Sequence, residues 1–400
     1  MILFFERGDV MQNFIFENPT RIIFGKGAIA RIGNEVKRFG SKVLLVYGQE
    51  SIKRHGIYDQ VVASLKDAKL SIVEFPGVQS NPLLSHALKG IALAYSENVD
   101  VVLAVGGGSV IDTAKTIAVG AKAEREDDVW EFFTFKKKIR NALPVLTAVT
   151  VSASASEMNP TAVMTKEEGA QKFSMSSPLI QPRVSILDPT VLFSLPATYS
   201  AFSAVDIITH MLEGYFNNTE PESPLQDRMV EGITKTVMES TEIVLKNPQD
   251  YNARANMMWS ATLAFNGLTT AGMGLISFPA HMIEHSLSAL FNIAHGAGLG
   301  IILPGWMSYA INKNPAKFAR FAREIFNIKE TDSLKAGRQG IDLLKRWFSS
   351  IGSPTSLKEA GISGTDIDKI AENASALAKL WGLKNYTKEV IAEILNLCRA

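Results

Sequence analysis

Short apolar runs alternate with helically spaced apolar residues through the first half of the chain. The runs cover residues 42–47, 70–75, 99–105, 144–149 and 184–187, and the helical patterns cover residues 58–67, 83–97 and 109–119. The run at residues 101–105 (VVLAV) lacks the period of two that marks a strand with one face in water, so we expect it to be buried on both faces. Strands that alternate with helices in this way predict βαβ units and a parallel sheet.

Long helical patterns replace the strands after about Pro196. They cover residues 200–216, 226–244, 251–266, 278–290, 315–326 and 334–349. A chain of 400 residues exceeds one small core, so we expect an α/β domain at residues 1–195 and an all-α domain at residues 196–400. No linker rich in Pro, Gly and Ser separates the domains, which predicts that they pack tightly and leave a ligand cleft between them.

The composition narrows the choice of partners and compartment. Hydrophobic residues make up 46% of the chain and the formal net charge is +1, so we expect a large core and no nucleic-acid partner. The four apolar residues before Glu6 are too few for a signal peptide, and no apolar run reaches the length of a membrane span. We therefore expect a cytoplasmic protein with no membrane contact. Met11 is an alternative start, which would make residues 1–10 a poorly ordered extension.

The chain contains one cysteine, Cys398. A single thiol excludes an internal disulfide and a cysteine-based metal site, and it fits a reducing compartment. Because Cys398 follows the apolar run of residues 391–397, a packed free thiol is favoured over a nucleophile.

Histidines cluster in the second half of a histidine-poor chain. Asp206 and His210 are spaced i,i+4 in an apolar helical pattern, so their side chains leave the same helix face. His281 and His285 repeat this spacing, and His295 follows them. A single buried histidine is more often a hydrogen-bonded core residue than a ligand, and Asp206 alone could be a buried polar group bonded to backbone N–H. Together, however, these residues predict one site for Fe²⁺, Zn²⁺ or Mn²⁺. The spacing leaves open whether His281 or His285 is the ligand.

A triple-glycine turn ends the strand pattern of residues 99–105 and opens a helix. Its residues are Gly106, Gly107 and Gly108, and Ser109 follows. Backbone N–H groups at such a turn, together with the helix N-terminus, are suited to bind a pyrophosphate. The run is neither G-x-G-x-x-G nor a Walker A loop, so a tight turn without a ligand is the alternative reading.

These motifs resemble those of the iron-containing, group III alcohol dehydrogenases, in the branch of butanol dehydrogenases and broad-range aldehyde reductases. The likeness runs from about Met11 to the end of the chain. It rests on GGGSVID at residues 106–112, SEMN at 156–159, LDP at 187–189, and D-x3-H, H-x3-H and H-x13-H in the second half. The resemblance implies a Rossmann-like parallel-sheet domain followed by a helical domain, as in dehydroquinate synthase. It also implies a metal-dependent enzyme that transfers hydride between NADP(H) and primary alcohols or aldehydes such as butanol and butanal.

The resemblance assigns roles to individual residues. The metal ligands would be Asp206, His210, His281 and His295, because the fourteen-residue step from His281 to His295 is the family's spacing. His285 would then be a proton relay near the substrate. The cofactor contacts would be Gly48, Ser51, Gly106, Gly107, Gly108, Ser109, Asp112, Thr150, Ser154, Asn159 and Lys172.

Two departures from the family pattern bear on the cofactor. Relatives often carry T-L-P-A-T-G-S-E where this chain has TVSASASE at residues 150–157, so nucleotide contacts carry over less directly there. Relatives that use NADP carry Gly-Gly-Gly-Ser where this chain has GQES at residues 48–51. The absence of an acidic residue at Gly48 favours NADP(H) over NAD(H), although Glu50 opposes this preference. The family likeness further implies one Fe²⁺ or Zn²⁺ ion and a homodimer that pairs through edge strands near residues 14–23.

Two other functions are compatible with these motifs. A zinc-dependent polyol dehydrogenase of the glycerol dehydrogenase type shares the triple-glycine loop but differs around the ligands. Reduction of butanal with NADPH, compared with oxidation of glycerol, separates it from the first reading. A metalloprotein that binds nucleotide for regulation is the second alternative, and it would bind NADPH tightly without turning over an aldehyde.

Overall fold

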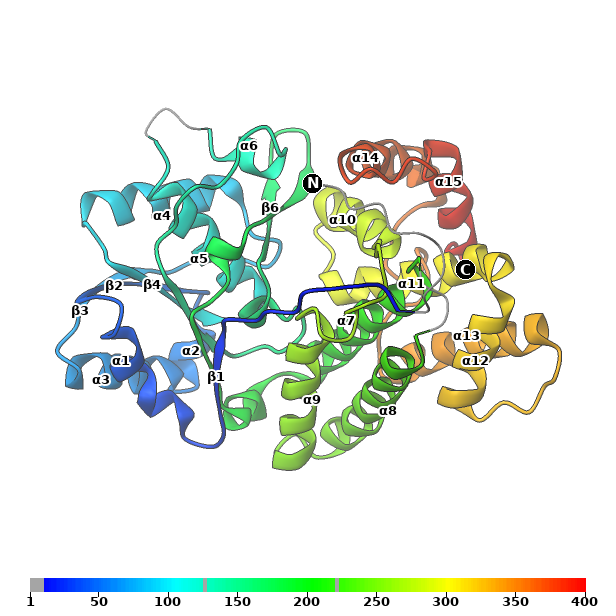
Figure 1. The fold of residues 1–400 in the computed structure, drawn as a ribbon, viewed down its shortest axis with the longest axis horizontal. Coiled ribbons are helices and arrows are strands. Elements are labelled where there is room, and N and C mark those ends of the chain that lie inside the picture. The colour runs from blue at the N-terminus through cyan, green and yellow to red at the C-terminus, as the bar shows by residue number, and fades with distance from the viewer. Residues whose placement is uncertain (1–10, 125–127, 220–222) are drawn as a thin grey trace.

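The computed structural model describes residues 11–124, 128–219 and 223–400. The expected extension at residues 1–10 lies outside the described residues. A part built around a sheet lies beside a part built from helices (Figure 1). The sheet ends with β8 (Val184–Leu187) and the first long helix, α7, covers Ala197–Phe216. The division of the chain at residue 195 stays a prediction.

Six parallel strands form the main sheet, in the order β1-β8-β5-β4-β2-β3. Besides β8, the strands are β1 (Arg21–Phe24), β2 (Lys42–Tyr47), β3 (Ser71–Phe75), β4 (Val101–Gly106) and β5 (Val145–Val149). The parallel sheet and its five expected strands are confirmed. β1 is an additional edge strand that we did not predict, because it has only four residues and a largely exposed face.

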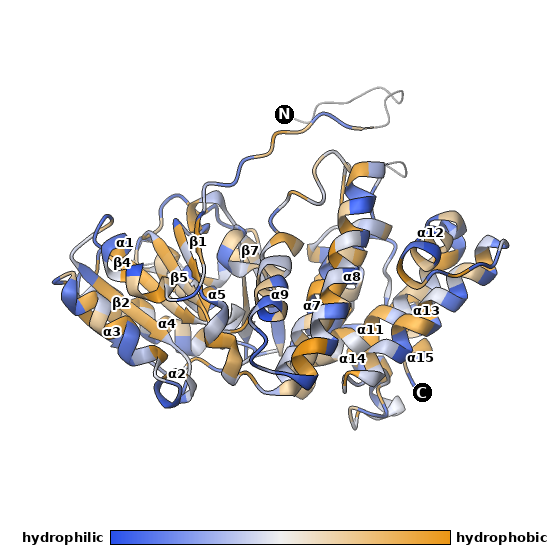
Figure 2. Ribbon diagram, turned by 90° about the horizontal axis from the view of Figure 1, so that it is seen from below, coloured by the Kyte–Doolittle hydropathy of each residue, from blue (hydrophilic) through white to orange (hydrophobic). Residues whose placement is uncertain are grey.

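Helices cover both faces of this sheet, which explains why its central strands β2, β4 and β5 are buried almost throughout. The helices are α1 (Ile32–Val36), α2 (Ser51–Arg54), α3 (Ile57–Asp67), α4 (Leu84–Ser96) and α5 (Gly108–Gly120), whereas α6 (Trp130–Phe133) packs against the strand at residues 171–176. Along β2, Val43 and Leu45 pack with α1 and α3, whereas Leu44 and Val46 pack with α4 and α5. Each fully buried aliphatic side chain contributes about 1.5–3 kcal/mol relative to its exposed state. β2 and β5 are drawn largely in orange in Figure 2.

A β-hairpin that we did not predict joins the sheet-bearing part to the helices. It consists of β6 (Thr161–Lys166) and β7 (Gln171–Ser176), which pair antiparallel. The apolar residues of its inner face, Met164 and Phe173 among them, belong to the same core cluster as the helices of the second half. β7 packs against α10 (Pro279–Phe291). The hairpin therefore shares its core with the helices of the second half, whereas two other core clusters pack on the faces of the main sheet.

The second half consists of helices. After α7 come α8 (Pro224–Lys246), α9 (Tyr251–Ala264), α10, α11 (His295–Ala310), α12 (Pro315–Phe326), α13 (Ser333–Ser350), α14 (Ile367–Leu380) and α15 (Lys388–Leu397). The six expected helices are confirmed within a few residues at each end, whereas α11, α14 and α15 were not predicted. Within the described residues, every helix is too short or too polar to cross a membrane.

The segment before β1 leaves the sheet as an extended arm. Residues 11–20 run from β1 toward the helical half (Figure 1) and project at the edge of the molecule in Figure 2, where Gln12 N donates to Gly272 O at 3.2 Å. Asn18 Nδ2 ties the arm down by donating to Met158 O at 3.0 Å and to Asn266 O at 3.3 Å. The side chains of Phe14, Ile15 and Phe16 remain 51%, 96% and 43% exposed.

Candidate active site

A cavity of about 860 Å³ lies between the sheet and the helical half. One wall is formed by the turn after β4, with Gly108 and Ser109 at the start of α5. Another wall carries Asp206 of α7, His281 of α10 and His295 of α11. The cavity therefore joins the glycine turn and the histidine cluster, the two features that the sequence singled out.

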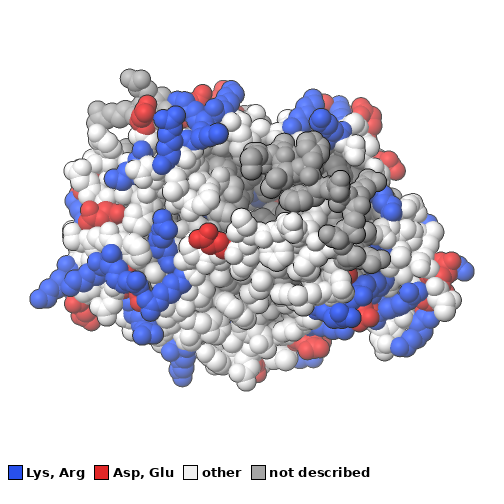
Figure 3. Space-filling model, viewed as in Figure 1, with Lys and Arg blue, Asp and Glu red and all other residues white. Residues whose placement is uncertain are grey.

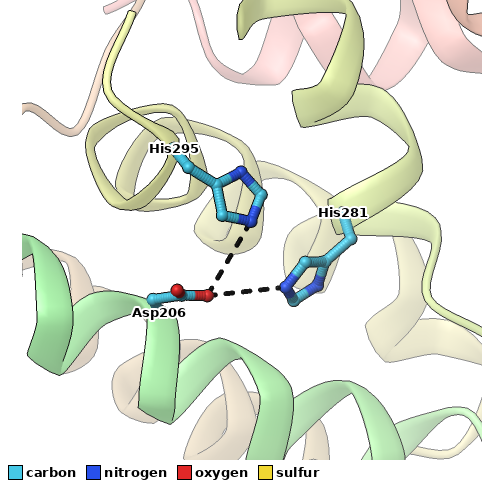
Figure 4. A group of neighbouring side chains, drawn as sticks. All are labelled: Asp206, His281 and His295. Carbon is cyan, nitrogen blue, oxygen red and sulfur yellow. Dashed lines mark ion pairs between the residues drawn. The ribbon is translucent and has the colours of Figure 1, made fainter. Parts of the chain in front are cut away.

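Asp206, His281 and His295 meet at the helical side of this cavity (Figure 4). Asp206 Oδ1 lies 3.7 Å from His281 Nε2 and 3.8 Å from His295 Nε2. Asp206 Oδ1 and His281 Nε2 are buried, and neither has a hydrogen-bond partner among the described residues. Buried polar atoms without partners are costly, and a cation shared between them removes that cost. The donor set therefore fits a divalent metal.

Two further carboxylates lie behind these imidazoles, and the sequence analysis missed both. His281 Nδ1 is hydrogen-bonded to Glu213, and His295 Nδ1 to Glu284. Because Nδ1 is engaged in this way, each ring turns its Nε2 toward Asp206, as is usual for metal-ligating histidines. Glu213 also accepts the backbone N–H groups of Ala280, at 2.5 Å, and of His281, at 3.2 Å, in the first turn of α10.

His210 lies beside this cluster rather than inside it. Its Nδ1 is 3.1 Å from Asp206 Oδ1 and 3.0 Å from the carbonyl oxygen of the same residue, one helical turn earlier. Its ring centroid is 4.3 Å from that of His281. Burial, followed by the nearby charge of His281, lowers the pKa of His210, which keeps the imidazole neutral as a ligand requires. Its place as a fourth ligand stays a prediction.

Charges within the cluster set the protonation of the other members. Burial alone would raise the pKa of Asp206, but the histidines, His210 above all, hold it well below its usual value. Burial alone would lower the pKa of His281, but Glu213 and Asp206 together raise it to about 9. Neighbouring charges therefore favour the charged forms of both Asp206 and His281.

His285 occupies a different position from His281, although the sequence spacing did not separate them. Its Nδ1 lies 3.0 Å from the carbonyl oxygen of Lys172, and its ring packs edge-on against Trp381 at 5.6 Å between centroids. A donor at Nδ1 leaves Nε2 as the acceptor. Burial, followed by the charge of Lys172, holds the pKa of His285 well below its usual value. Its role as a proton relay stays a prediction.

The glycine turn needs its glycines for close packing against the loop after β5. A Cβ at Gly107 would stand 2.9 Å from Val151 Cβ, and one at Gly108 would stand 2.4 Å from Ser154 Oγ. Gly108, Ser109 and Ser154 line the cavity, whereas Gly106 and Gly107 lie behind them. The first turn of α5 thus meets the cavity where a pyrophosphate would use its free N–H groups.

Asp112 and Asn159 also line the cavity, but their hydrogen bonds go to protein groups. Asp112 accepts from Ser156 Oγ at 2.6 Å. Asn159 Oδ1 accepts from the buried Lys115 at 3.2 Å, and Ser156 Oγ accepts from the same ammonium group at 2.9 Å. This network ties α5 to the loop before β6, so that Asp112 and Asn159 shape the cavity wall.

The remaining predicted cofactor residues lie at neighbouring strand ends. Gly48 follows β2, Ser51 begins α2, and Thr150 follows β5, where its N–H donates to Gly106 O at 3.0 Å. These three residues do not line the cavity, whereas Lys172 does. β2 and β5 flank β4, so their ends lie on either side of the glycine turn. All these cofactor contacts stay predictions.

Comparison with known proteins gives one consistent result. The family model for iron-containing alcohol dehydrogenase matches residues 19–189, and the model for the C-terminal part of the Fe-containing alcohol dehydrogenase family matches residues 200–400. A probable NADH-dependent butanol dehydrogenase 1 of Bacillus subtilis is 39% identical over 389 residues, which cover 96% of this chain and 99% of that protein. An NADPH-dependent aldehyde reductase of Escherichia coli is 35% identical over 359 residues, covering 89% and 91%.

A solved structure agrees with these matches over nearly the whole length. The crystal structure of an NADH-dependent butanol dehydrogenase A from Thermotoga maritima superimposes with a TM-score of 0.94 at 45% identity, covering 98% of this chain and 99% of that one. Its likeness extends over the sheet, the hairpin and the helices together. The chain belongs to the iron-containing alcohol dehydrogenase family.

Proposed function

We propose that this chain transfers hydride reversibly between NADP(H) and primary alcohols or aldehydes, such as butanol and butanal, at a single divalent metal. The proposal rests mainly on one observation. Asp206 Oδ1 and His281 Nε2, both buried and without a hydrogen-bond partner among the described residues, face a cavity whose other wall is the start of α5. Membership of the alcohol dehydrogenase family supports the same reaction class.

The residues around the cavity would have separate roles in this reaction. Asp206, His210, His281 and His295 would hold the metal, which when bound acts as a Lewis acid on a carbonyl or hydroxyl oxygen. The start of α5 would orient the dinucleotide, whose nicotinamide carries the hydride. The neutral His285 would accept or return the proton at Nε2, because its Nδ1 is already engaged with the carbonyl oxygen of Lys172.

Aromatic side chains beside the metal ligands support an alkyl substrate. The ring of Phe265 lies 5.0 Å from that of His210, and the ring of Phe278 lies 5.9 Å from that of His281. Both aromatic side chains line the cavity, together with Ile276. A polyol such as glycerol would leave hydroxyl groups unpaired against this wall. The apolar wall favours butanol-like substrates over the polyols of the glycerol dehydrogenase type.

The proposed preference for NADP(H) rests on the end of β2. Gly48 leaves space where an acidic residue would bind the free 2′-hydroxyl of NAD, and Lys53 and Arg54 supply positive charge in the adjoining α2. Glu50 opposes the preference. The relatives' names point in both directions, since they include NADH-dependent butanol dehydrogenases and an NADPH-dependent aldehyde reductase. The ratio of kcat/KM with NADPH to kcat/KM with NADH tests the proposed preference, and a ratio below one would overturn it.

The metal, the quaternary structure and the compartment complete the proposal. A carboxylate and imidazole site without thiolates takes Fe²⁺ or Zn²⁺.

The exposed apolar arm at Phe14, Ile15 and Phe16 and the free edge of β1 support a homodimer, since open strand edges pair readily. Sedimentation analysis tests it, and a monomer at micromolar concentration would contradict it. The unpaired thiol of Cys398 supports a reducing cytoplasm.

Steady-state assays on metal-stripped protein test the function directly. Reconstitution with Fe²⁺ or Zn²⁺ should restore NADPH oxidation with butanal and leave glycerol a poor substrate. His210→Ala should lose bound metal and activity together. Full activity of metal-free protein would overturn the proposal. Tight NADPH binding without turnover of any aldehyde would identify a nucleotide-binding regulator instead.

A further inference from the structure

Lys172 and Glu284 form a buried ion pair in the wall between the metal ligands and the rest of the cavity. Lys172 Nζ lies 3.6 Å from Glu284 Oε2, and the two side chains are 5% and 0% exposed. The same oxygen of Glu284 accepts a hydrogen bond from His295 Nδ1, while Oε1 accepts one from Ser288. One carboxylate oxygen therefore serves both a candidate metal ligand and a lysine.

The ammonium group of Lys172 is also held from the opposite side. It donates to Asn81 Oδ1 at 3.1 Å, and Asn81 Nδ2 in turn donates to Asn292 Oδ1 at 3.1 Å and to Ile293 O at 3.0 Å. Asn292 and Ile293 lie between α10 and α11, directly before His295. Lys172 is therefore fixed to the metal-binding helices by protein contacts alone.

Because the ion pair between Lys172 and Glu284 is buried, the loss of either partner should disturb the residues around it. A carboxylate with no exposed surface is costly unless cations balance its charge, and removing one partner of a buried pair is far more damaging than removing an exposed one. Glu284 is also closely packed, since a Cβ at Gly298 would stand 2.6 Å from its Oε1. The carboxylate thus occupies one position, in which Lys172 and His295 share Oε2.

We propose that Lys172 is a positioning residue for the metal site. It holds Glu284 in the orientation that directs His295 Nε2 toward Asp206. The inference rests on the proposed function in taking Asp206 and His295 as metal ligands. Loss of a carboxylate that orients a ligating histidine typically weakens metal binding by about 10–100-fold. Lys172 therefore strengthens metal binding before any nicotinamide is bound, whatever contact it makes with the cofactor itself.

Zn²⁺ affinity tests this inference on metal-stripped protein without nicotinamide, by competition with a chelating dye. Lys172→Met keeps the length of the side chain and removes its charge, and we expect about 10–100-fold weaker binding. Glu284→Gln should have a similar effect. The double variant should lose less Zn²⁺ affinity than the product of the two single losses, because both substitutions break the same contact between Lys172 and Glu284. The Co²⁺-loaded variants should show a changed visible spectrum, which reports the geometry around His295.

Lys166→Met is the matched control, since it removes a partly exposed lysine of the same hairpin and should bind Zn²⁺ like the wild type. An affinity of Lys172→Met within about twofold of the wild type, well short of the expected loss, would overturn the inference. If Lys172→Met does not fold, Glu284→Gln provides the test. Unchanged Zn²⁺ affinity of Glu284→Gln would overturn the inference, because Lys172 is proposed to act on His295 through Glu284. A wild-type protein that binds no divalent metal would overturn the proposed function instead.

Discussion

Replacing Lys115 by methionine should cost the protein much of its stability. Lys115 has no exposed surface, and its Nζ donates to Ser156 Oγ at 2.9 Å, to Asn159 O at 2.9 Å and to Thr161 O at 2.6 Å. Ser156 passes the interaction on to Asp112 Oδ1 at 2.6 Å. Burial lowers the pKa of Lys115 to about 8, against the opposing charge of Asp112, so the ammonium form prevails at pH 7.

The magnitude follows from what methionine leaves behind. Each buried acceptor that loses its donor costs roughly 1–3 kcal/mol, and removing one member of a buried charged pair costs about 3–5 kcal/mol. These contributions overlap, because the same ammonium group supplies both. We therefore expect Lys115→Met to lower the free energy of unfolding by about 4 kcal/mol, a large share of the ~5–15 kcal/mol typical of folded proteins.

Equilibrium urea unfolding of the metal-free protein measures this loss. Lys89→Met, which removes an exposed lysine from the neighbouring α4, is the control and should change the free energy by less than ~0.5 kcal/mol. Because Ser156, Asn159 and Thr161 line the cavity, Lys115→Met should also weaken NADPH binding. A loss below about 1 kcal/mol would refute the reasoning, since it would mean that the buried acceptors find other donors.

Four further predictions concern single positions. Gly298→Ala should cost about 1–3 kcal/mol and weaken metal binding, because its Cβ would stand 2.6 Å from Glu284 Oε1. Gly232→Ala, with open space around its Cβ in α8, should stabilise the protein by about 0.5–1 kcal/mol, and equilibrium urea unfolding measures the effect of both glycine substitutions. His285→Ala should lower kcat by about 10²–10⁴-fold and leave the metal content unchanged; loss of metal would place His285 among the ligands. Burial raises the pKa of the Cys398 thiol to about 12, so the thiol's contribution to stability should be complete below about pH 8.5 and decline above it. Alkylation of the native protein should accordingly stay slow to about pH 10, and a rate that rises through about pH 8.5 would contradict this.

The elements that could be predicted are those whose local pattern agrees with their tertiary surroundings. β2 and β8 have the bounds expected from their apolar runs, because both strands are buried on two faces. α12 also has its expected bounds, since Asn314 caps it, Pro315 occupies its first position and Asn327 ends it in a left-handed conformation.

The elements that were missed have local patterns that conflict with their surroundings. α11 begins with a glycine-rich run and contains Pro304, which favour a loop, and burial on nearly all sides removes the polar stripe that marks a helix. At the site, the ligand types could be predicted from spacing, but Glu213 and Glu284 could not. Their roles depend on contacts between different helices, and the one local signal is a carboxylate within an apolar helical pattern.

The candidate ligands Asp206, His281 and His295 all come from helices of the second half, whereas the glycine turn belongs to the sheet. The proposed ion and dinucleotide would thus be held by separate parts of the protein, on opposite walls of one cavity. Stripping the metal should accordingly leave the protein contacts proposed for the dinucleotide in place, so that nucleotide binding can be titrated on metal-free protein.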